Sequence, residues 1–149
     1  LLDGQPVYDV EALTDYARAY DPNARYINFV YPPFVLFLAV PFSLLPVQAA
    51  FHVWNALSAA LFFMAARPYA RDGVPAVTTL LTPAAVLCVL FGQYGLLVGA
   101  LWLWAFRLLP WAAAALAMKP HIGFLIAVPL LRRKRFLALA TLILLGVMV

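Results

Sequence analysis

The sequence predicts an all-α, polytopic helical membrane protein. Of its 149 residues, 66% are apolar and 11% are charged, whereas soluble domains are about 45–50% apolar and about 25% charged. Arg25 is followed by no charged residue until Arg67, and Asp72 by none until Arg107. Each of these runs exceeds the roughly 20 residues that a helix needs to cross a bilayer. The net charge of +4 comes from residues at the ends of spans, so we expect the lipid bilayer and no nucleic acid as a partner.

The main polar region of the chain is residues 1–30, which we expect to form an extracytoplasmic loop. They contain five of the six acidic residues. Val10 and Leu13 begin an apolar pattern with helical spacing. Asp9 is suited to cap the start of this helix and Pro22 to end it. The pattern predicts a short amphipathic helix on the membrane surface, with an ordinary loop helix as the alternative.

Residues 31–149 are expected to form the transmembrane helical region, in which short or re-entrant helices accompany full-length ones. The first and fourth segments are too short to span a bilayer, and the fifth carries Lys119 and Pro120 near its middle. The expected membrane segments are Phe34–Leu45, Val47–Ala66, Val74–Phe91, Tyr94–Phe106, Pro110–Leu131 and Phe136–Val149.

The basic residues decide between two orientations of these segments. If every segment crosses once, the RRKR cluster at 132–135 is cytoplasmic and the arginines between positions 67 and 107 lie outside. If the first and fifth segments are re-entrant, seven of the ten basic residues are cytoplasmic. Cytoplasmic loops are enriched in lysine and arginine, so we prefer the second arrangement. It places the YPP and GQYG stretches and the turn at Lys119 on the extracytoplasmic side.

Both ends of the sequence lead us to expect a fragment that is truncated at each end. The chain begins with Leu1 rather than Met, and it stops at Val149 within an apolar run of 14 residues. Cys88 is the single cysteine and lies in an apolar stretch. We therefore expect neither a disulfide nor a cysteine-based metal site, and a buried thiol of this kind is most often a small core side chain.

Lys119, in the stretch LAMKPHIG, is the strongest candidate for chemistry. A charged side chain near the middle of a membrane is costly, so it usually faces a cavity or a partner. Pro120 disfavours helical backbone at the preceding residue, so we expect the helix to break at Lys119 and the ammonium to reach water. The pattern favours a cation that holds an anionic headgroup such as a phosphate, with a snorkelling lysine as the alternative.

The two histidines are weaker candidates. His121 follows the Lys119 turn, although a lone histidine is more often a hydrogen-bonded structural residue. His52 lies near Trp54 and Asn55, which form a polar stripe inside a span. No set of His, Asp and Glu has metal-ligand spacing, so we predict no bound metal.

Two further residues are suited to contact a sugar or an acceptor. Gln93 and its neighbour Tyr94 interrupt a long uncharged run in the stretch FGQYG, whose glycines permit a tight turn. Gln93 can hydrogen-bond a hydroxylated ligand, with a plain interhelical turn as the alternative. Tyr31 precedes Pro32 and Pro33, which hold it extended where a half-helix enters the membrane surface.

Taken in order, five stretches of the chain resemble glycosyltransferase family 87. Its members are membrane enzymes with the GT-C fold and include polyprenol-phosphate-mannose-dependent mannosyltransferases. The similar stretches are LLDGQPVYD, NFVYPPFVLFLAVPFSLLP, HVWNALS, GQYGLLVGAL and AAAALAMKPHIGFLIAVPLLRRKRF. Each stretch alone is a weak signal, but the five occur in the order and spacing of the family. The resemblance extends over almost the whole chain.

The resemblance implies an inverting, metal-independent hexosyltransferase in the plasma membrane, multi-pass, with its active face extracytoplasmic. The sugar, usually mannose, would pass from a polyprenyl-phosphate donor to a glycolipid or glycan acceptor, with no cofactor. Lys119 matches the family's K-P motif and is the expected contact to the donor phosphate. The family's aspartate base lies at a position before Leu1, and neither Asp3 nor Asp9 matches it. We therefore assign no catalytic base and expect the fragment itself to be inactive.

Two other functions fit a mid-membrane cation and broken helices. One is a transporter or flippase of lipid-linked sugars, and the other is a non-catalytic membrane assembly protein. An aspartate just after a first transmembrane helix, upstream of Leu1, would favour the enzyme over both.

Overall fold

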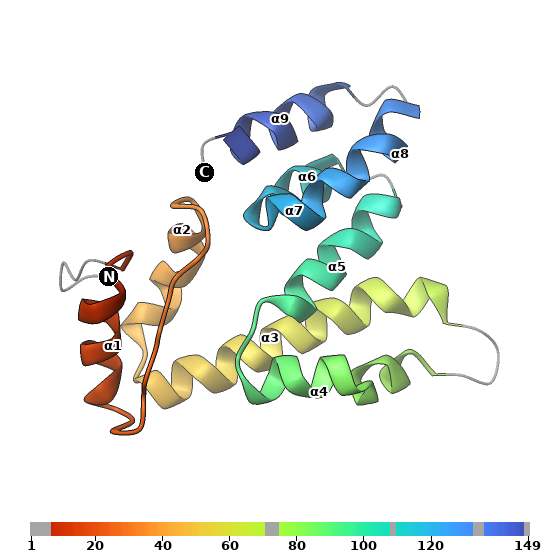
Figure 1. Ribbon diagram of the computed structural model, residues 1–149. Coiled ribbons are helices and arrows are strands. Elements are labelled where there is room, and N and C mark those ends of the chain that lie inside the picture. Colours follow the sequence, from red (N-terminus) through yellow and green to blue (C-terminus); the bar gives the residue numbers. More distant parts are fainter. Residues whose placement is uncertain (1–6, 71–74, 108–109, 133–135, 148–149) are drawn as a thin grey trace. The chain divides into compact units, whose positions relative to one another are not determined.

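The structure is a computed structural model of the chain and describes residues 7–70, 75–107, 110–132 and 136–147 (Figure 1). Within these residues the fold is all-helical and has no strand, as the sequence predicts. The chain divides into two compact units, Leu1–Leu45 and Pro46–Val149. The first contains α1 (Val10–Arg18), α2 (Val35–Ala39) and the 3-10 helix η1 (Val40–Leu44). The second contains α3 (Val47–Ala66), η2 (Arg67–Tyr69), η3 (Ala76–Leu81), α4 (Pro83–Leu90), α5 (Gly95–Phe106), α6 (Pro110–Ala115), η4 (Leu116–Met118), α7 (Pro120–Gly123), η5 (Phe124–Ile126), α8 (Ala127–Arg132) and α9 (Phe136–Val147).

The first helix, α1, begins where the sequence predicts. The Asp9 carboxylate oxygen Oδ1 accepts hydrogen bonds from two backbone N–H groups of the first turn, at 3.0 and 3.1 Å. These bonds satisfy amides that the start of a helix otherwise leaves unpaired. The helix ends at Arg18, earlier than the predicted end at Pro22, because the next amides turn back to the carbonyl of Ala17.

The apolar stretch that closes the first unit is short, as predicted, because prolines interrupt it. The N–H of Val35 donates to the Pro32 carbonyl at 3.0 Å, and α2 follows directly. Pro41 lies inside η1 and has no N–H to continue an α-helix. Leu45 is extended, with φ −104° and ψ 151°, which is the backbone conformation favoured before a proline such as Pro46.

The α3 helix matches the predicted segment Val47–Ala66 residue for residue. Together with η2 it spans 23 residues and, within the described part of the chain, is the one helix long and apolar enough to cross a membrane. Val53, Leu57 and Met64 on this helix are 47%, 44% and 60% exposed. A core helix of a soluble protein would bury such side chains. The length and the exposed apolar surface of α3 therefore indicate membrane association.

The α3 and α5 helices pack against each other and run in the same direction (Figure 1). Gly99 of α5 faces Phe62 of α3 so closely that an added Cβ would lie 2.9 Å from the ring carbon Cε2. Further along both helices, the Tyr69 hydroxyl donates to the Leu103 carbonyl at 2.8 Å. Later residues of α5 therefore contact later residues of the α3–η2 segment, as in a parallel pair of helices.

This parallel arrangement gives the pair of helices two chemically different ends. Arg67 follows α3 and Arg107 follows α5, so both arginines lie at the same end. The turn at 91–94 precedes α5 and lies at the other end. The predicted grouping of basic residues away from Gln93 thus holds for these two arginines, whereas Arg71 lies outside the described residues.

The predicted segment Val74–Phe91 is not one continuous helix, which corrects the sequence-based expectation. Val74 lies outside the described residues, and the segment is divided into η3 and α4. The physical reason is Pro83, which disfavours helical backbone at the residue before it. Thr82 is accordingly extended, with φ −65° and ψ 144°. Its hydroxyl oxygen accepts from the N–H of Ala85 at 3.3 Å and caps α4.

The segment Pro110–Leu131 breaks at Lys119, as predicted. The backbone of Lys119, at φ −130° and ψ 80°, lies outside the helical region, in accord with the restriction that Pro120 imposes. The preceding helix η4 is buried and packs against α5, α7 and α9, while α6 packs against α5 and α9. The turn at Lys119 is therefore held by a packed group of helices. The three basic residues at 133–135 lie outside the described residues.

Candidate functional site

The four site residues predicted from the sequence lie in two turns and one loop. Gln93 is in the turn between α4 and α5, and Lys119 and His121 are where η4 meets α7. Tyr31 belongs to the first unit and precedes α2. The structure therefore joins Lys119 and His121 in one turn and places Gln93 in a separate turn of the same unit.

The backbone of Gln93 is fixed by the C-terminal cap of α4. Gly92 has φ +59°, a left-handed conformation that glycine adopts without steric cost. The N–H of Gln93 donates to the Cys88 carbonyl at 2.9 Å, and the N–H of Gly92 donates to the Val89 carbonyl at 3.4 Å. This pair of bonds is a Schellman motif. It confirms the predicted turn and directs the exposed Gln93 side chain outward from a fixed backbone.

The Gln93 turn is attached to α3 by aromatic residues. The indole Nε1 of Trp54 donates to the Gly92 carbonyl at 3.1 Å. The Trp54 and Tyr94 rings also pack together, with centroids 4.7 Å apart. Phe51 closes the turn from the same helix, since a Cβ on Gly92 would lie 2.9 Å from a Phe51 ring carbon. These contacts set the position of Gln93 relative to α3.

Trp54 is the residue at this turn that the sequence did not assign. The sequence identifies Trp54 and Asn55 as a polar stripe within a span, which was the available signal. Asn55 is only 8% exposed, and its Nδ2 has no hydrogen-bond partner among the described residues. Buried donors are normally paired, so this amide is an exception within the described part of the chain. His52, by contrast, is exposed and packs its ring edge-to-face with Phe51.

Lys119 is held by a short set of backbone hydrogen bonds. Its N–H donates to the Leu116 carbonyl at 3.0 Å, and its own carbonyl accepts from the N–H groups of Ile122 and Gly123 at 3.0 and 2.7 Å. The side chain is half-buried. A lysine ammonium carries three N–H donors and acts as a compact charge toward phosphate.

The backbones on either side of the Lys119 turn approach each other closely at Gly123 and Leu116. An added Cβ at Gly123 would collide with the carbonyl oxygen of Leu116 and lie 2.8 Å from its carbonyl carbon. Leu116 is completely buried. Only glycine allows α7 to approach η4 this closely, so Gly123 determines the geometry of the turn. Gly123 was not among the residues predicted from the sequence, although its place three residues after the helix-breaking K-P pair was the available signal.

His121 and Tyr31 have different surroundings. His121 is exposed on α7, two residues from Lys119. Tyr31 is half-buried, and its backbone carbonyl accepts from the Tyr8 hydroxyl at 3.0 Å. The Phe29 ring packs on both tyrosine rings, with centroids 5.6 Å from Tyr31 and 5.7 Å from Tyr8. Tyr31 is thus part of an aromatic cluster of the first unit.

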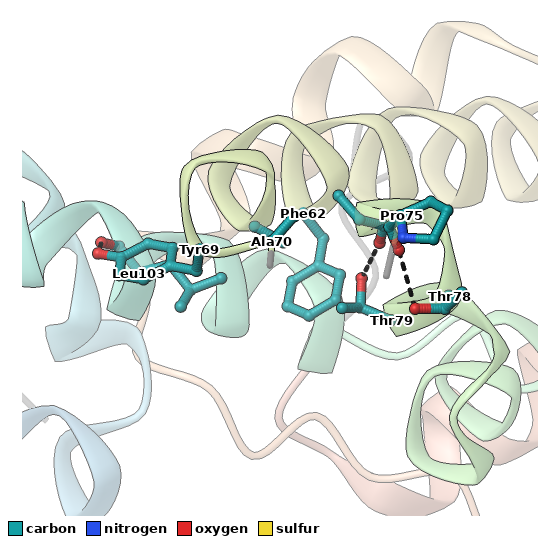
Figure 2. Close-up of a pocket in the computed structure, with 9 residues that line it drawn as sticks. Phe62, Tyr69, Ala70, Pro75, Thr78, Thr79 and Leu103 are labelled. Carbon is teal, nitrogen blue, oxygen red and sulfur yellow. Dashed lines mark hydrogen bonds between the residues drawn. The ribbon is translucent and has the colours of Figure 1, made fainter. Parts of the chain in front are cut away.

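A cavity of about 400 Å³ lies at the arginine-bearing end of α3 and α5 (Figure 2). The residues that line it are Phe62, Ala66, Tyr69, Ala70, Pro75, Ala76, Thr78, Thr79 and Leu103. None of the four predicted site residues belongs to this lining. Leu103 lies eight residues beyond Gly95, which is about 12 Å along the helix at a rise of about 1.5 Å per residue. The cavity is therefore separate from the Gln93 turn.

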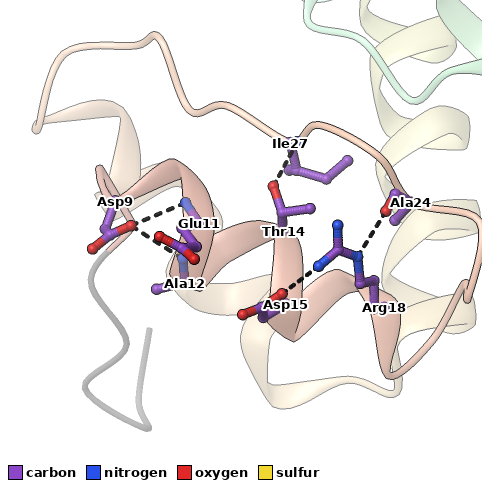
Figure 3. A network of polar contacts seen from close by, with 8 residues as sticks. All are labelled: Asp9, Glu11, Ala12, Thr14, Asp15, Arg18, Ala24 and Ile27. Carbon is purple, nitrogen blue, oxygen red and sulfur yellow. Dashed lines mark hydrogen bonds and ion pairs between the residues drawn. The ribbon is translucent and has the colours of Figure 1, made fainter.

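Figure 3 shows two acidic side chains of the first unit that have structural partners. Asp9 caps α1, and Asp15 forms an ion pair with Arg18 at 2.5 Å. Arg18 also donates through Nε to the Ala24 carbonyl at 3.1 Å. Thr14 is buried, and its hydroxyl oxygen accepts a hydrogen bond from the backbone N–H of Ile27 at 3.0 Å. Asp9 therefore has a structural role as a helix cap.

Two further predictions concern Asp3 and the absence of a bound metal. Asp3 lies outside the described residues. Within the part of the chain that the structure describes, no three His, Cys, Asp or Glu side chains lie close enough to hold a metal ion. The expectation of a metal-independent reaction stays a prediction.

Comparison with known proteins identifies one family. The model of glycosyltransferase family 87 matches residues 29–149. The match includes Tyr31, the Gln93 turn and the Lys119 turn, as well as α3 and α5. No curated protein and no solved structure matches the chain at a significant level.

Proposed function

The chain belongs to glycosyltransferase family 87. From that premise we propose that it transfers a hexosyl group, with mannosyl as the first candidate, from a polyprenyl-phosphate donor. The acceptor is a glycolipid or glycan on the extracytoplasmic face of the plasma membrane. Family membership places the activity in the class of glycosyl transfer, which favours this function over a transporter or an assembly protein. The lipid-linked donor is a substrate, and we propose no cofactor.

The observation that carries the proposal is the Lys119 turn. A half-buried lysine follows a buried helix and lies at a break that backbone hydrogen bonds and a glycine contact hold in place. A fixed cation of this kind is suited to a phosphate group. We assign the donor phosphate to Lys119, with Gln93 and His121 as contacts of the sugar or the acceptor. Tyr31, in the first unit, stays a prediction for the same role.

The proposed reaction is a single displacement with inversion. The acceptor hydroxyl oxygen forms a bond to the anomeric carbon as the bond from that carbon to the phosphate oxygen breaks. The hydroxyl proton passes to a general base, which the described residues do not identify. Negative charge accumulates on the leaving phosphate, where Lys119 stabilises it.

The proposed placement in the membrane is multi-pass, with the Gln93 and Lys119 turns on the extracytoplasmic side. The support is the parallel packing of α3 and α5, which leaves Arg67 and Arg107 at the end away from Gln93. Basic residues favour the cytoplasmic side. The same end holds the apolar cavity, which lies apart from the proposed reaction site.

The proposal is tested by replacing Lys119 in the intact, full-length protein and measuring sugar transfer from a polyprenyl-phosphate donor. Lys119→Ala should lower kcat by about 10²–10³-fold, the usual effect of removing one group that stabilises developing negative charge. Lys119→Arg should retain part of the activity because it keeps the charge. Arg132→Gln is the matched control, because it removes one positive charge from an exposed position on α8. Normal turnover by Lys119→Ala, with unchanged thermal unfolding, would show that Lys119 does not contact the phosphate.

A further inference from the structure

The cavity at the arginine-bearing end of α3 and α5 presents an apolar surface to its contents (Figure 2). Phe62, Tyr69 and Leu103 contribute the large side chains of the lining, and three alanines and a proline contribute most of the rest. Its volume of about 400 Å³ lies in the range of pockets that bind small molecules, about 300–1,000 Å³. Residues 71–74, which follow Ala70, lie outside the described part and are not included in the site.

The polar groups of the lining are already engaged within the protein. The Tyr69 hydroxyl donates to the Leu103 carbonyl at 2.8 Å. The Thr78 hydroxyl donates to the carbonyl of Pro75, the residue before η3, at 2.8 Å, and the Thr79 hydroxyl donates to the carbonyl of Ala76 at 2.6 Å. Each hydroxyl proton thus points back to the backbone, and the threonine methyl groups remain for the cavity. A sugar or a phosphate would find few donors here, whereas a hydrocarbon chain fits.

Two cations stand beside the cavity. Arg67 directly follows Ala66, a lining residue, and Arg107 lies one helical turn beyond Leu103, another lining residue. Both arginines are exposed. The ion pair that the structure gives among the described residues joins Arg18 and Asp15, so it involves neither of these arginines. The cavity therefore combines an apolar interior with positive charge at its edge.

We propose that this cavity binds one anionic phospholipid, with an acyl chain between Phe62 and Leu103 and the phosphate at Arg67 and Arg107. Basic pockets between membrane helices on the cytoplasmic side bind anionic headgroups in the same way. The inference rests on the proposal that α3 and α5 lie in a membrane, and it does not depend on the reaction at Lys119. The lipid joins the ends of α3, η3 and α5 and stabilises their packing.

The test uses the purified protein in a neutral detergent and measures lipid binding and thermal unfolding. Phosphatidylglycerol should bind and raise the unfolding temperature, whereas phosphatidylcholine with the same acyl chains and free glycerol phosphate should not. Ala70→Phe, which fills the cavity, should abolish the effect, and Ala60→Phe on the exposed side of α3 should preserve it. Arg67→Gln combined with Arg107→Gln should weaken phosphatidylglycerol binding by about 30-fold, whereas Arg132→Gln should not.

The same experiment contains the outcomes that contradict the proposal. Equal stabilisation by both phospholipids would refute the role of the arginines, and stabilisation by glycerol phosphate would replace the lipid with a free phosphate. If Ala70→Phe disturbs the fold, a phosphatidylglycerol with a photoreactive group in its acyl chain gives a second measurement on the unmodified sequence. Cross-links at Phe62 and Leu103 support the site, and cross-links confined to the outer surface of α3, such as at Met64, refute it. Sugar transfer is measured separately, so loss of transfer in the Lys119 variants leaves this result unaffected.

Discussion

The indole Nε1 of Trp54 donates a hydrogen bond to the backbone carbonyl oxygen of Gly92 at 3.1 Å. This bond joins the first half of α3 to the Schellman turn that ends α4. Because Gln93 follows Gly92 directly, its position depends on a side chain 39 residues earlier in the sequence. A turn that is a local feature of the sequence is thereby placed by a long-range contact.

Replacing Trp54 should destabilise the turn. Trp54→Phe retains most of the ring surface against Tyr94 but leaves the Gly92 carbonyl without its donor, which should lower the free energy of unfolding by about 1 kcal/mol. Trp102→Phe is the matched control, because the Trp102 Nε1 has no hydrogen-bond partner among the described residues. Thermal unfolding in detergent measures both variants. Equal losses in the two would mean that the bond to Gly92 contributes nothing.

Replacing Gly123 should disturb the Lys119 turn. Gly123 has helical backbone, at φ −59° and ψ −37°, so alanine there would favour the helix by about 1 kcal/mol on propensity alone. The added Cβ nevertheless collides with the Leu116 carbonyl, and we expect Gly123→Ala to be destabilising and to impair sugar transfer. At Gly99 the nearest obstacle is the Phe62 ring, which can rotate, so Gly99→Ala should cost less. A Gly123→Ala protein that is as stable and active as the unmodified protein would disprove the close approach of α7 to η4.

Variants of Asp9 separate a capping role from a catalytic one. Asparagine caps a helix about as well as aspartate, whereas alanine costs about 1 kcal/mol. Asp9→Asn should therefore preserve both the stability of the first unit and sugar transfer, and Asp9→Ala should lower stability. Hydrogen exchange of the α1 amides measures the stability of the first unit in both variants. Loss of transfer in a fully folded Asp9→Asn protein would instead identify Asp9 as a base.

The proposed orientation can be tested with single cysteines in a Cys88→Ala protein. Gln93→Cys should react with a membrane-impermeant maleimide from outside intact cells. Arg107→Cys should react only after the membrane is opened, because it lies at the other end of α5. Reaction of both cysteines from the same side would overturn the proposed topology.

Much of the helical architecture could be predicted from the order of apolar runs and prolines. The α3 helix matched its predicted bounds, and the breaks near Pro41 and at Lys119 lie where proline restricts the backbone. The division of Val74–Phe91 at Thr82 was missed, although Pro83 was visible in the sequence. The prediction followed the length of the apolar run, which is nearly enough to cross a bilayer, and did not include the break that Pro83 causes.

The candidate site was less predictable than the fold. Gln93 and Lys119 were identified because each interrupts an apolar run, and such an interruption is a local signal. Trp54 and Gly123 act through contacts with Gly92 and Leu116. The first is a long-range pairing, and the second depends on how closely two short helices approach. The polar stripe at Trp54 and the glycine after the K-P pair are visible in the sequence, but neither signal identifies the residue that it contacts.

The sequence by itself determined the all-helical fold, the family and the positions of the two polar turns, because these depend on residue type and on backbone restrictions within a few residues. Only the tertiary structure decided that α3 and α5 run in the same direction, that Trp54 holds the Gln93 turn and that an apolar cavity lies beside Arg67 and Arg107. These features depend on which helix faces pack together. In a chain with apolar residues around most of each helix, the hydrophobic pattern leaves that choice to close contacts at glycines and to single hydrogen bonds.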